Sequence, residues 1–181
     1  AVDHGKCIDT SMGLTPLEGL MMGTRTGDLD ASVVLAIMKK EGKTPDEMQD
    51  LLNKKSGLLG ISGLGSDMRD VENGVKEGNE RAKLALDMYN YRIKKYIGAY
   101  AAAMNGVDII VWTAGVGEND KFMRKNICAY LEYLGVEIDD ERNNVRGEER
   151  LISTDSSKVK VYLLPTNEEL AIARDTLALT K

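Results

Sequence analysis

The stretch that most constrains the fold is Val107 to Asn119, where an apolar run leads into two closely spaced glycines. The run is mostly β-branched, and Asp108 is its only charged residue before the glycines. Such a run predicts a central strand that is covered on both faces. Gly115 and Gly117 predict a sharp backbone turn after the strand. The sequence therefore indicates a strand–turn–helix unit of an α/β fold.

The same glycine turn is a candidate anion site. The helix expected from about Lys121 would point its N-terminal N–H groups back at the turn, and such groups bind phosphates. A glycine-rich connection without any ligand is equally consistent with this stretch, because short Gly-x-Gly matches are common.

Composition places the chain among globular proteins. Its 181 residues suit one good-sized domain, and its 43% hydrophobic share supports a core. The formal net charge of −5 argues against a nucleic-acid partner. We expect no membrane partner, because no apolar run reaches the ~18 residues of a span. No secretory signal pattern opens the chain.

The few cysteines and the single histidine argue against a disulfide framework, a cysteine metal site and a histidine-based catalytic mechanism. Two cysteines, Cys7 and Cys128, are too few for a disulfide framework, and no other potential metal ligands lie near them at a metal-binding spacing. This pattern predicts reduced thiols in a cytoplasmic protein. His4 is the only histidine, so a Ser-His-Asp or Cys-His mechanism is disfavoured.

The first residues suggest a piece of a longer protein. Residue 1 is Ala rather than Met, and residues 3–6 look like the tip of a hairpin whose first strand is missing. We therefore expect the chain to be a fragment.

Caps and hydrophobic spacing locate the other elements. Helices are expected from Thr15 to Met22, Ala31 to Glu41, Thr44 to Lys54, Ser66 onward, Asn79 to Met104, Phe122 to Leu134 and Thr166 to Leu179. Strands are expected at residues 6–10, 136–138 and 158–164, a tight loop at 58–64, and an exposed charged segment at 139–149.

Arg25 is the candidate of most chemical interest in the first half of the chain. It lies between Gly23 and Gly27, where a planar guanidinium could grip a phosphate or carboxylate. The local sequence favours a simpler interpretation, a surface arginine paired with Asp28 or Asp30.

Two further places carry charge at helix starts. Asp67 suits the positive end of the helix after Ser66, but Arg69 is disfavoured there and is not explained by helix-end electrostatics. Glu168 follows the strand that ends at Leu164, so it is expected near Gly115–Asn119 at the carboxyl edge of the sheet. Its simpler interpretation is a carboxylate that stabilises the helix dipole.

Several longer motifs together resemble the C-terminal half of the acetate kinase family, and the resemblance covers essentially the whole chain. They stand in the family's order and are far more specific than a single glycine motif. They are residues 9–13 (DTSMG), 15–25 (TPLEGLMMGTR), 27–28 (GD), 53–57 (NKKSG), 113–119 (TAGVGEN) and 165–174 (PTNEELAIAR).

The resemblance implies a fold and a reaction. The fold is that of an actin-like ATPase (ribonuclease H-like) domain, a mixed sheet with helices on both faces. The reaction is reversible transfer of the γ-phosphoryl group of ATP to acetate, giving acetyl phosphate and ADP, with Mg²⁺ or alternatively Mn²⁺ as cofactor. The family also implies a homodimer through the C-terminal domain.

The resemblance assigns roles to the candidate residues. Arg25 is expected beside the transferring phosphoryl group as the catalytic residue, and Glu168 is expected to support the metal. Nucleotide contacts are expected from Asp67, Met68, Arg69, Gly115, Val116, Gly117, Glu118 and Asn119. Met68 departs from the family, which usually has Phe or another apolar residue there, and we expect little consequence.

Other family residues have no counterpart here. The resemblance implies an N-terminal domain that supplies an asparagine, an arginine, a histidine and a catalytic aspartate, and a phosphate segment upstream. His4 is not the family histidine. We therefore expect the chain alone to be inactive or nearly so, as residues 1–181 of a nucleotide-binding domain. Alternatives are a propionate or butyrate kinase, and a non-catalytic nucleotide-binding or dimerisation module.

Overall fold

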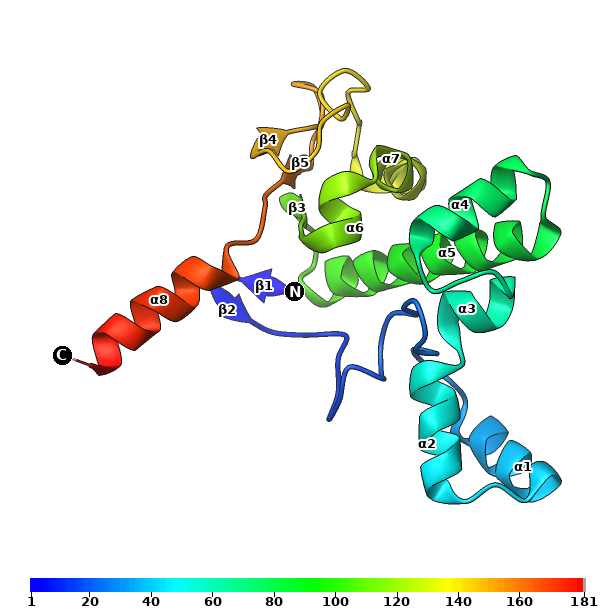
Figure 1. Cartoon of the computed structure of the whole chain (residues 1–181). Helices are drawn as coiled ribbons and strands as arrows, with labels where there is room; N and C mark the ends of the chain where they lie inside the picture. Colours follow the sequence, from blue (N-terminus) through cyan, green and yellow to red (C-terminus); the bar gives the residue numbers. More distant parts are fainter. Residues whose placement is uncertain (181) are drawn as a thin grey trace. The chain divides into compact units, whose positions relative to one another are not determined.

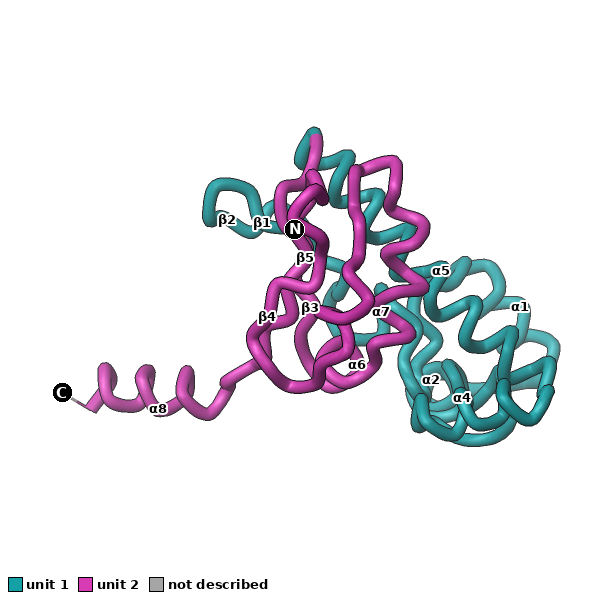
Figure 2. Tube along the Cα trace, turned by 90° about the horizontal axis from the view of Figure 1, so that it is seen from above, with its two compact units in different colours: residues 1–105 teal, residues 106–181 magenta. Residues whose placement is uncertain are grey.

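The computed structural model describes residues 1–180, and the chain divides into two compact units, Ala1–Asn105 and Gly106–Lys181. Figure 2 colours the two units separately. No described helix is both long enough and apolar enough to cross a membrane.

Unit 1 is a short hairpin followed by helices (Figure 1). The hairpin pairs β1 (Val2–Asp3) with β2 (Lys6–Cys7) in antiparallel fashion. The predicted hairpin tip is thus confirmed. The helices are α1 (Ala31–Glu41), α2 (Pro45–Lys54), α3 (Gly57–Ser62), α4 (Met68–Lys76) and α5 (Glu80–Ala103).

Local capping explains why three of these helices agree with the sequence prediction. Asp30 accepts a hydrogen bond from the Ser32 amide, and Thr44 forms a capping box with Glu47. Asn79 caps α5, which packs against both α3 and α4. The core of unit 1 lies along these contacts, with Leu58, Val71, Ala82, Ala85 and Ile93 buried.

Three predictions in unit 1 are wrong. Residues 15–22 form turns rather than a helix, because Gly19 has a φ of +102° and donates its N–H to the Asp28 carboxylate. Residues 58–64 are mostly helical rather than a loop. They belong to α3, which is closed at its C-terminal end by Gly63 in a left-handed conformation. The cap of α4 is Asp67 rather than Ser66.

Unit 2 is an α/β unit with a three-stranded mixed sheet. Its strands are β3 (Ile109–Trp112), β4 (Arg150–Leu151) and β5 (Lys160–Leu163), in the order β3–β5–β4. β3 runs parallel to β5, with Trp112 opposite Leu163, and β4 runs antiparallel to β5. The helices are α6 (Ala114–Asn119), α7 (Lys121–Cys128), the 3₁₀ turn η1 (Glu132–Leu134) and α8 (Glu168–Leu179).

The strand after the long helix is not central in this sheet. β3 lies at one edge, and its side chains alternate between exposed Ile109 and Val111 and buried Ile110 and Trp112. A β-branched run suits a half-buried strand as well as a fully buried one, so the sequence did not separate the two cases.

Several other elements of unit 2 are shorter than predicted. α7 ends at Cys128 because the Tyr130 and Leu131 amides donate to carbonyls only three residues back, and Gly135 then closes η1. Residues 136–138 contribute only a bridge between Ile138 and Ser153, and α8 begins after Asn167 rather than Thr166. The charged segment 139–149 is mostly exposed, but Asn143 is buried.

Candidate functional site

The predicted site residues fall in both units. Unit 1 holds Arg25 and residues 67–69, and unit 2 holds residues 115–119 and Glu168. Each group is described within its own unit.

The loop that carries Arg25 is held by its own backbone. The Met22 amide donates to the Arg25 carbonyl at 3.0 Å, and the Thr26 amide donates to Leu52 at 3.1 Å. The Thr24 hydroxyl donates to the Asn53 carbonyl at 2.8 Å. These bonds fasten the loop to the end of α2, so the Cα of Arg25 has a fixed position.

The Arg25 guanidinium has no carboxylate partner among the described residues. Its one side-chain contact is from Nη1 to the sulfur of Met22, at 3.8 Å. Asp28 is bound to Arg92 and Tyr96 instead, and Asp30 caps α1. The interpretation of Arg25 as a surface arginine paired with Asp28 or Asp30 is therefore wrong.

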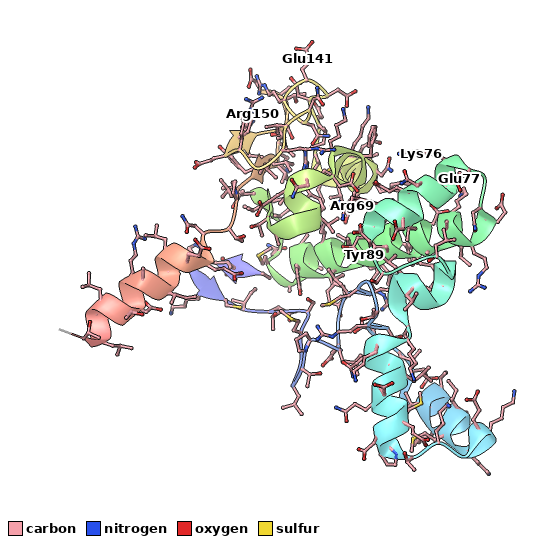
Figure 3. The ribbon with its side chains drawn as sticks, viewed as in Figure 1. Arg69, Lys76, Glu77, Tyr89, Glu141 and Arg150 are labelled. Atoms are coloured by element: carbon pink, nitrogen blue, oxygen red, sulfur yellow. The ribbon has the colours of Figure 1, made fainter. Side chains whose placement is uncertain are left out.

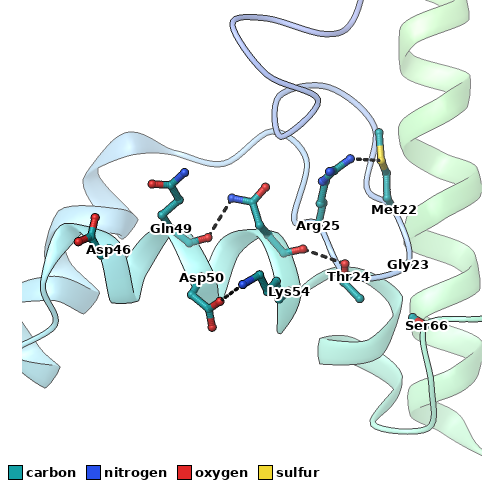
Figure 4. A pocket seen from close by; sticks show the side chains of 10 residues that line it. Met22, Gly23, Thr24, Arg25, Asp46, Gln49, Asp50, Lys54 and Ser66 are labelled. Carbon is teal, nitrogen blue, oxygen red and sulfur yellow. Dashed lines mark hydrogen bonds and ion pairs between the residues drawn. The ribbon is translucent and has the colours of Figure 1, made fainter.

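Arg25 lines a pocket of about 680 Å³. Figure 4 shows the loop residues Met22 to Arg25 on one side and the polar face of α2 on the other. The α2 wall carries Asp46, Gln49, Asp50, Asn53 and Lys54, and Ser66 completes the lining. Lys54 pairs with Asp50 at 2.7 Å, which leaves Arg25 as the cation of this pocket that no described carboxylate neutralises.

Asp28 is the point where the Arg25 loop joins α5. Its carboxylate accepts hydrogen bonds from the Gly19 amide at 2.8 Å, Arg92 Nη1 at 2.9 Å and the Tyr96 hydroxyl at 2.7 Å. Burial, and then the hydrogen bond to Asp28, raise the pKa of Tyr96 to about 12. The phenol therefore stays protonated as a donor at neutral pH.

Residues 67–69 form the start of α4. Asp67 accepts from Arg69 Nε and Nη2 and from the Arg69 amide, and these bonds, the side-chain ones most, lower the pKa of Asp67 to about 2. Arg69 is thus held by the cap residue although it lies at the unfavourable end of the helix dipole. Met68 is buried in unit 1, while Arg69 is exposed (Figure 3).

The predicted glycine turn is the short helix α6. Gly115 and Gly117 keep ordinary φ values within it, and the left-handed residue is Ala114, with a φ of +61°. The turn geometry expected of the glycines is therefore wrong, since the chain reverses one residue earlier. A Cβ added at Gly115 would meet no atom within 4 Å, so the chain's own packing does not require glycine there.

The ends of β3 and β5 bring the two unit 2 candidates together. The Thr166 amide donates to Glu118 Oε1 at 3.0 Å, two residues before Glu168. Parallel pairing of the strands places both segments at one sheet edge, as the sequence predicted. Glu168 is exposed in the first turn of α8.

A metal site built by the chain alone is absent from the described residues, because no three His, Cys, Asp or Glu side chains cluster suitably. Mg²⁺ usually keeps several waters and takes one or two carboxylates together with substrate phosphates. A single exposed carboxylate such as Glu168 fits that manner of binding, and a cage of protein ligands does not.

Sequence reasoning missed Arg124, which is fully buried in unit 2. Its guanidinium donates to the carbonyl oxygens of Gly117, Asn143 and Val145. The signal was its spacing, since Arg124 lies three, four and seven residues before the buried Ile127, Cys128 and Leu131.

A family model and the similar sequences both point to one protein family. The family model described as the Acetokinase family matches residues 1–174. Acetate kinase of Thermotoga petrophila is 63% identical over 179 residues, which are 97% of this chain and 44% of that protein. Acetate kinase of Fervidobacterium nodosum is 65% identical over 178 residues, again 97% of this chain and 44% of the relative.

Solved structures of the same kind share the fold. Porphyromonas gingivalis acetate kinase superposes with a TM-score of 0.95 at 51% identity, over 99% of this chain and 45% of that one. A propionate kinase from Francisella tularensis gives a TM-score of 0.88 at 44% identity, over 96% and 44%. The predicted fold class, an α/β actin-like ATPase domain, is confirmed. The chain spans less than half the length of these proteins.

Proposed function

Because the chain belongs to the acetokinase family, we propose that it is the C-terminal, nucleotide-binding half of an acetate kinase. The longer protein transfers the γ-phosphoryl group of ATP reversibly to acetate, giving acetyl phosphate and ADP. The chain alone lacks the acetate-binding half and is inactive by itself. The protein acts in the cytoplasm.

One observation carries the proposal: Arg25 is fixed by its backbone on a pocket and has no carboxylate partner among the described residues. A guanidinium held in this way keeps its donors for an external anion. Its planar fork suits the oxygens of a phosphoryl group, whose negative charge must be stabilised during transfer. Arg25 is therefore assigned to the transferring phosphoryl group.

The nucleotide contacts are assigned to residues 67–69 in unit 1 and residues 115–119 in unit 2. Open space over Gly115 supports close approach of a ligand to the backbone. Arg69 is exposed at the start of α4, and its hydrogen bonds to Asp67 restrict its position. Each segment, taken within its own unit, therefore has features that suit contact with a nucleotide.

Glu168 is assigned to the metal. It would hold Mg²⁺ through one carboxylate, largely by way of water, and the bound ion neutralises phosphate charge. The hydrogen bond from the Thr166 amide to Glu118 joins the residues just before α8 to the segment assigned to the nucleotide.

The first test is calorimetric titration of the 181-residue chain with ADP and Mg²⁺. Saturable binding is expected, and it should be lost in Gly115→Leu, at a position where an added Cβ meets no protein atom within 4 Å. Asn126→Leu, an exposed change on α7, is the control and should bind normally. Absence of binding by the unaltered chain would contradict a self-sufficient nucleotide site.

A propionate kinase is the second candidate, favoured by the 44% identity to the Francisella tularensis structure. Acyl phosphate formation by the longer gene product, measured with acetate, propionate and butyrate, separates the two. The highest kcat/KM for acetate is expected. A clear preference for a longer acid would replace the first proposal.

A homodimer through this domain is also proposed. Leu84, Met88 and Tyr91 recur at helical spacing on α5 and are exposed, which supports an apolar contact with a second copy. Sedimentation of the chain should give the dimer mass, and Met88→Lys should give the monomer. A monomeric unaltered chain would contradict this assignment.

A further inference from the structure

Arg124 is buried in unit 2 without an ion-pair partner among the described residues. Its side chain has 0% exposure. Nε donates to Asn143 Oδ1 at 2.8 Å, Nη1 to the Gly117 carbonyl at 2.8 Å, and Nη2 to the Asn143 and Val145 carbonyls at 2.9 Å. The guanidinium therefore joins α6 to α7, which carries it, and to the segment 143–145.

Burying a charged arginine in a core costs more free energy than burying an apolar side chain. A buried cation loses its hydration, and carbonyl dipoles replace that loss only when their geometry is good. Burial lowers the pKa of Arg124, which reflects this cost, although the Asp120 charge favours the charged form. An apolar side chain would fill the same volume, so the hydrogen bonds themselves are the distinguishing feature of Arg124.

α6, which accepts one of these hydrogen bonds, needs stabilising contacts from other parts of the chain. α6 has six residues, and its cap residue Thr113 makes no side-chain hydrogen bond to the helix. Ala114 begins it in the left-handed region at a φ of +61°, which is unfavourable for a residue with a Cβ. A helix this short is not stable by its own hydrogen bonds.

Hydrogen bonds to α6 from other described segments come from Arg124, from the segment next to it, and from Thr166, which donates to the Glu118 side chain. Arg124 binds the Gly117 carbonyl, and the Gly147 amide donates to the Glu118 carbonyl at 3.4 Å. Asn143 Nδ2 donates to the Lys121 carbonyl at 2.9 Å, so the segment is also fastened to the start of α7. Of these contacts, the one from Arg124 is made by a fully buried side chain to the α6 backbone, so we expect it to contribute most to the position of α6.

We infer that Arg124 is a positioning residue that fixes α6 for nucleotide binding through the Gly117 carbonyl. It acts through backbone atoms of the segment 114–119 and contacts no ligand itself. The ligand part of this inference rests on the proposed function, whereas the effect on α6 does not.

The test that is independent of any ligand is amide hydrogen exchange of the 181-residue chain, in the unaltered form and as Arg124→Lys. Lysine keeps the positive charge but cannot reach all four acceptors. Exchange at the Asp120 amide, which donates to Val116, should speed up about tenfold or more. Amides of β5 should change much less. Uniform acceleration across unit 2, or no change in α6, would overturn the inference.

A core variant on the same helix separates positioning from general loss of stability. Ile127→Ala removes a fully buried side chain but none of the Arg124 hydrogen bonds. It should accelerate exchange throughout unit 2 without selective loss in α6. Lys125→Ala, which breaks only an exposed ion pair with Asp140, should leave exchange unchanged. Selective opening of α6 in Ile127→Ala would contradict a specific role for Arg124.

ADP titration with Mg²⁺ then tests the link to the ligand. Arg124→Lys should weaken binding about tenfold or more, while Ile127→Ala, compared at a temperature where it is folded, should bind normally. If the unaltered chain binds no ADP, the nucleotide site proposal fails and the exchange result still decides the role of Arg124. If both variants bind ADP like the unaltered chain, Arg124 has no role in the site.

A milder variant carries the test if Arg124→Lys does not fold. Asn143→Ala removes the Oδ1 acceptor of Arg124 Nε and the Nδ2 bond to the Lys121 carbonyl, but it leaves the arginine in place. It should give the same selective loss of α6 protection at smaller size. Unchanged protection in a folded Asn143→Ala chain would count against the inference.

Discussion

Arg92 and Asp28 lie 64 residues apart in the sequence, and Arg92 Nη1 donates to Asp28 Oδ2 at 2.9 Å. The pair joins α5 to the loop that carries Arg25. Because Asp28 is engaged in this way, it does not neutralise Arg25, and the Arg25 guanidinium remains free to bind an anion.

The Tyr96 hydroxyl completes this junction, so Tyr96→Phe should destabilise the chain. The lost donor leaves Asp28 with one hydrogen bond fewer, and a partly buried bond to a charged group contributes about 1 kcal/mol to the free energy of unfolding. Urea unfolding at neutral pH measures the difference. Tyr133→Phe, at an exposed tyrosine of unit 2, is the control and should change stability by less than about 0.5 kcal/mol.

Removal of the Arg25 guanidinium should slow the reaction of the longer protein. Arg25→Ala should lower kcat by about 10³-fold, as loss of a donor to transition-state charge typically does, and leave the Kd for ATP near normal. Steady-state kinetics of acetyl phosphate formation measure the effect. Arg25→Lys keeps the charge but loses the planar fork, so intermediate activity is expected. An unchanged kcat in Arg25→Ala would remove Arg25 from the catalytic role.

Glu168 should determine the metal requirement of the same protein. In Glu168→Ala, a higher Mg²⁺ concentration is needed for half-maximal rate, because one carboxylate no longer supports the ion. Glu169→Ala is a matched control, since both residues lie in the first acidic turn of α8. Equal Mg²⁺ dependence in the two variants would assign Glu168 to the helix dipole alone.

Asp67 makes stability depend on acid pH. The side-chain hydrogen bonds from Arg69, followed by the bond from its amide, lower the pKa of Asp67 from 3.8 to about 2 in the folded chain. A folded-state pKa below the unfolded one means that the ionised carboxylate stabilises the fold above about pH 4, and that this contribution is lost as the pH falls toward about 2. Urea unfolding should therefore show Asp67→Asn to be less stable at neutral pH, with the difference shrinking toward about pH 2. A difference that stays constant with pH would contradict the assignment.

Local sequence determined the elements whose stabilising contacts lie close in the chain. α1, α2 and α5 follow the caps Asp30, Thr44 and Asn79, because a cap bonds only to amides two or three residues away. The helix expected at residues 15–22 failed because Asp28, nine residues beyond Gly19, takes the Gly19 amide. β3 was likewise predicted to be a central strand, because an all-apolar run does not reveal which of its residues alternate between buried and exposed.

The motifs likewise predicted candidate site residues, but only the tertiary structure decided which contacts their side chains make. The sequence placed Arg25 beside two acidic residues and favoured an ion pair, whereas contacts from α5 occupy Asp28 and leave Arg25 unpaired. Sequence reasoning missed Arg124, and only the fold supplied its acceptors, the carbonyl oxygens of residues 117, 143 and 145. The physical reason is that the charge and hydrogen bonds of a side chain depend on neighbours brought close by folding, and local sequence does not contain them.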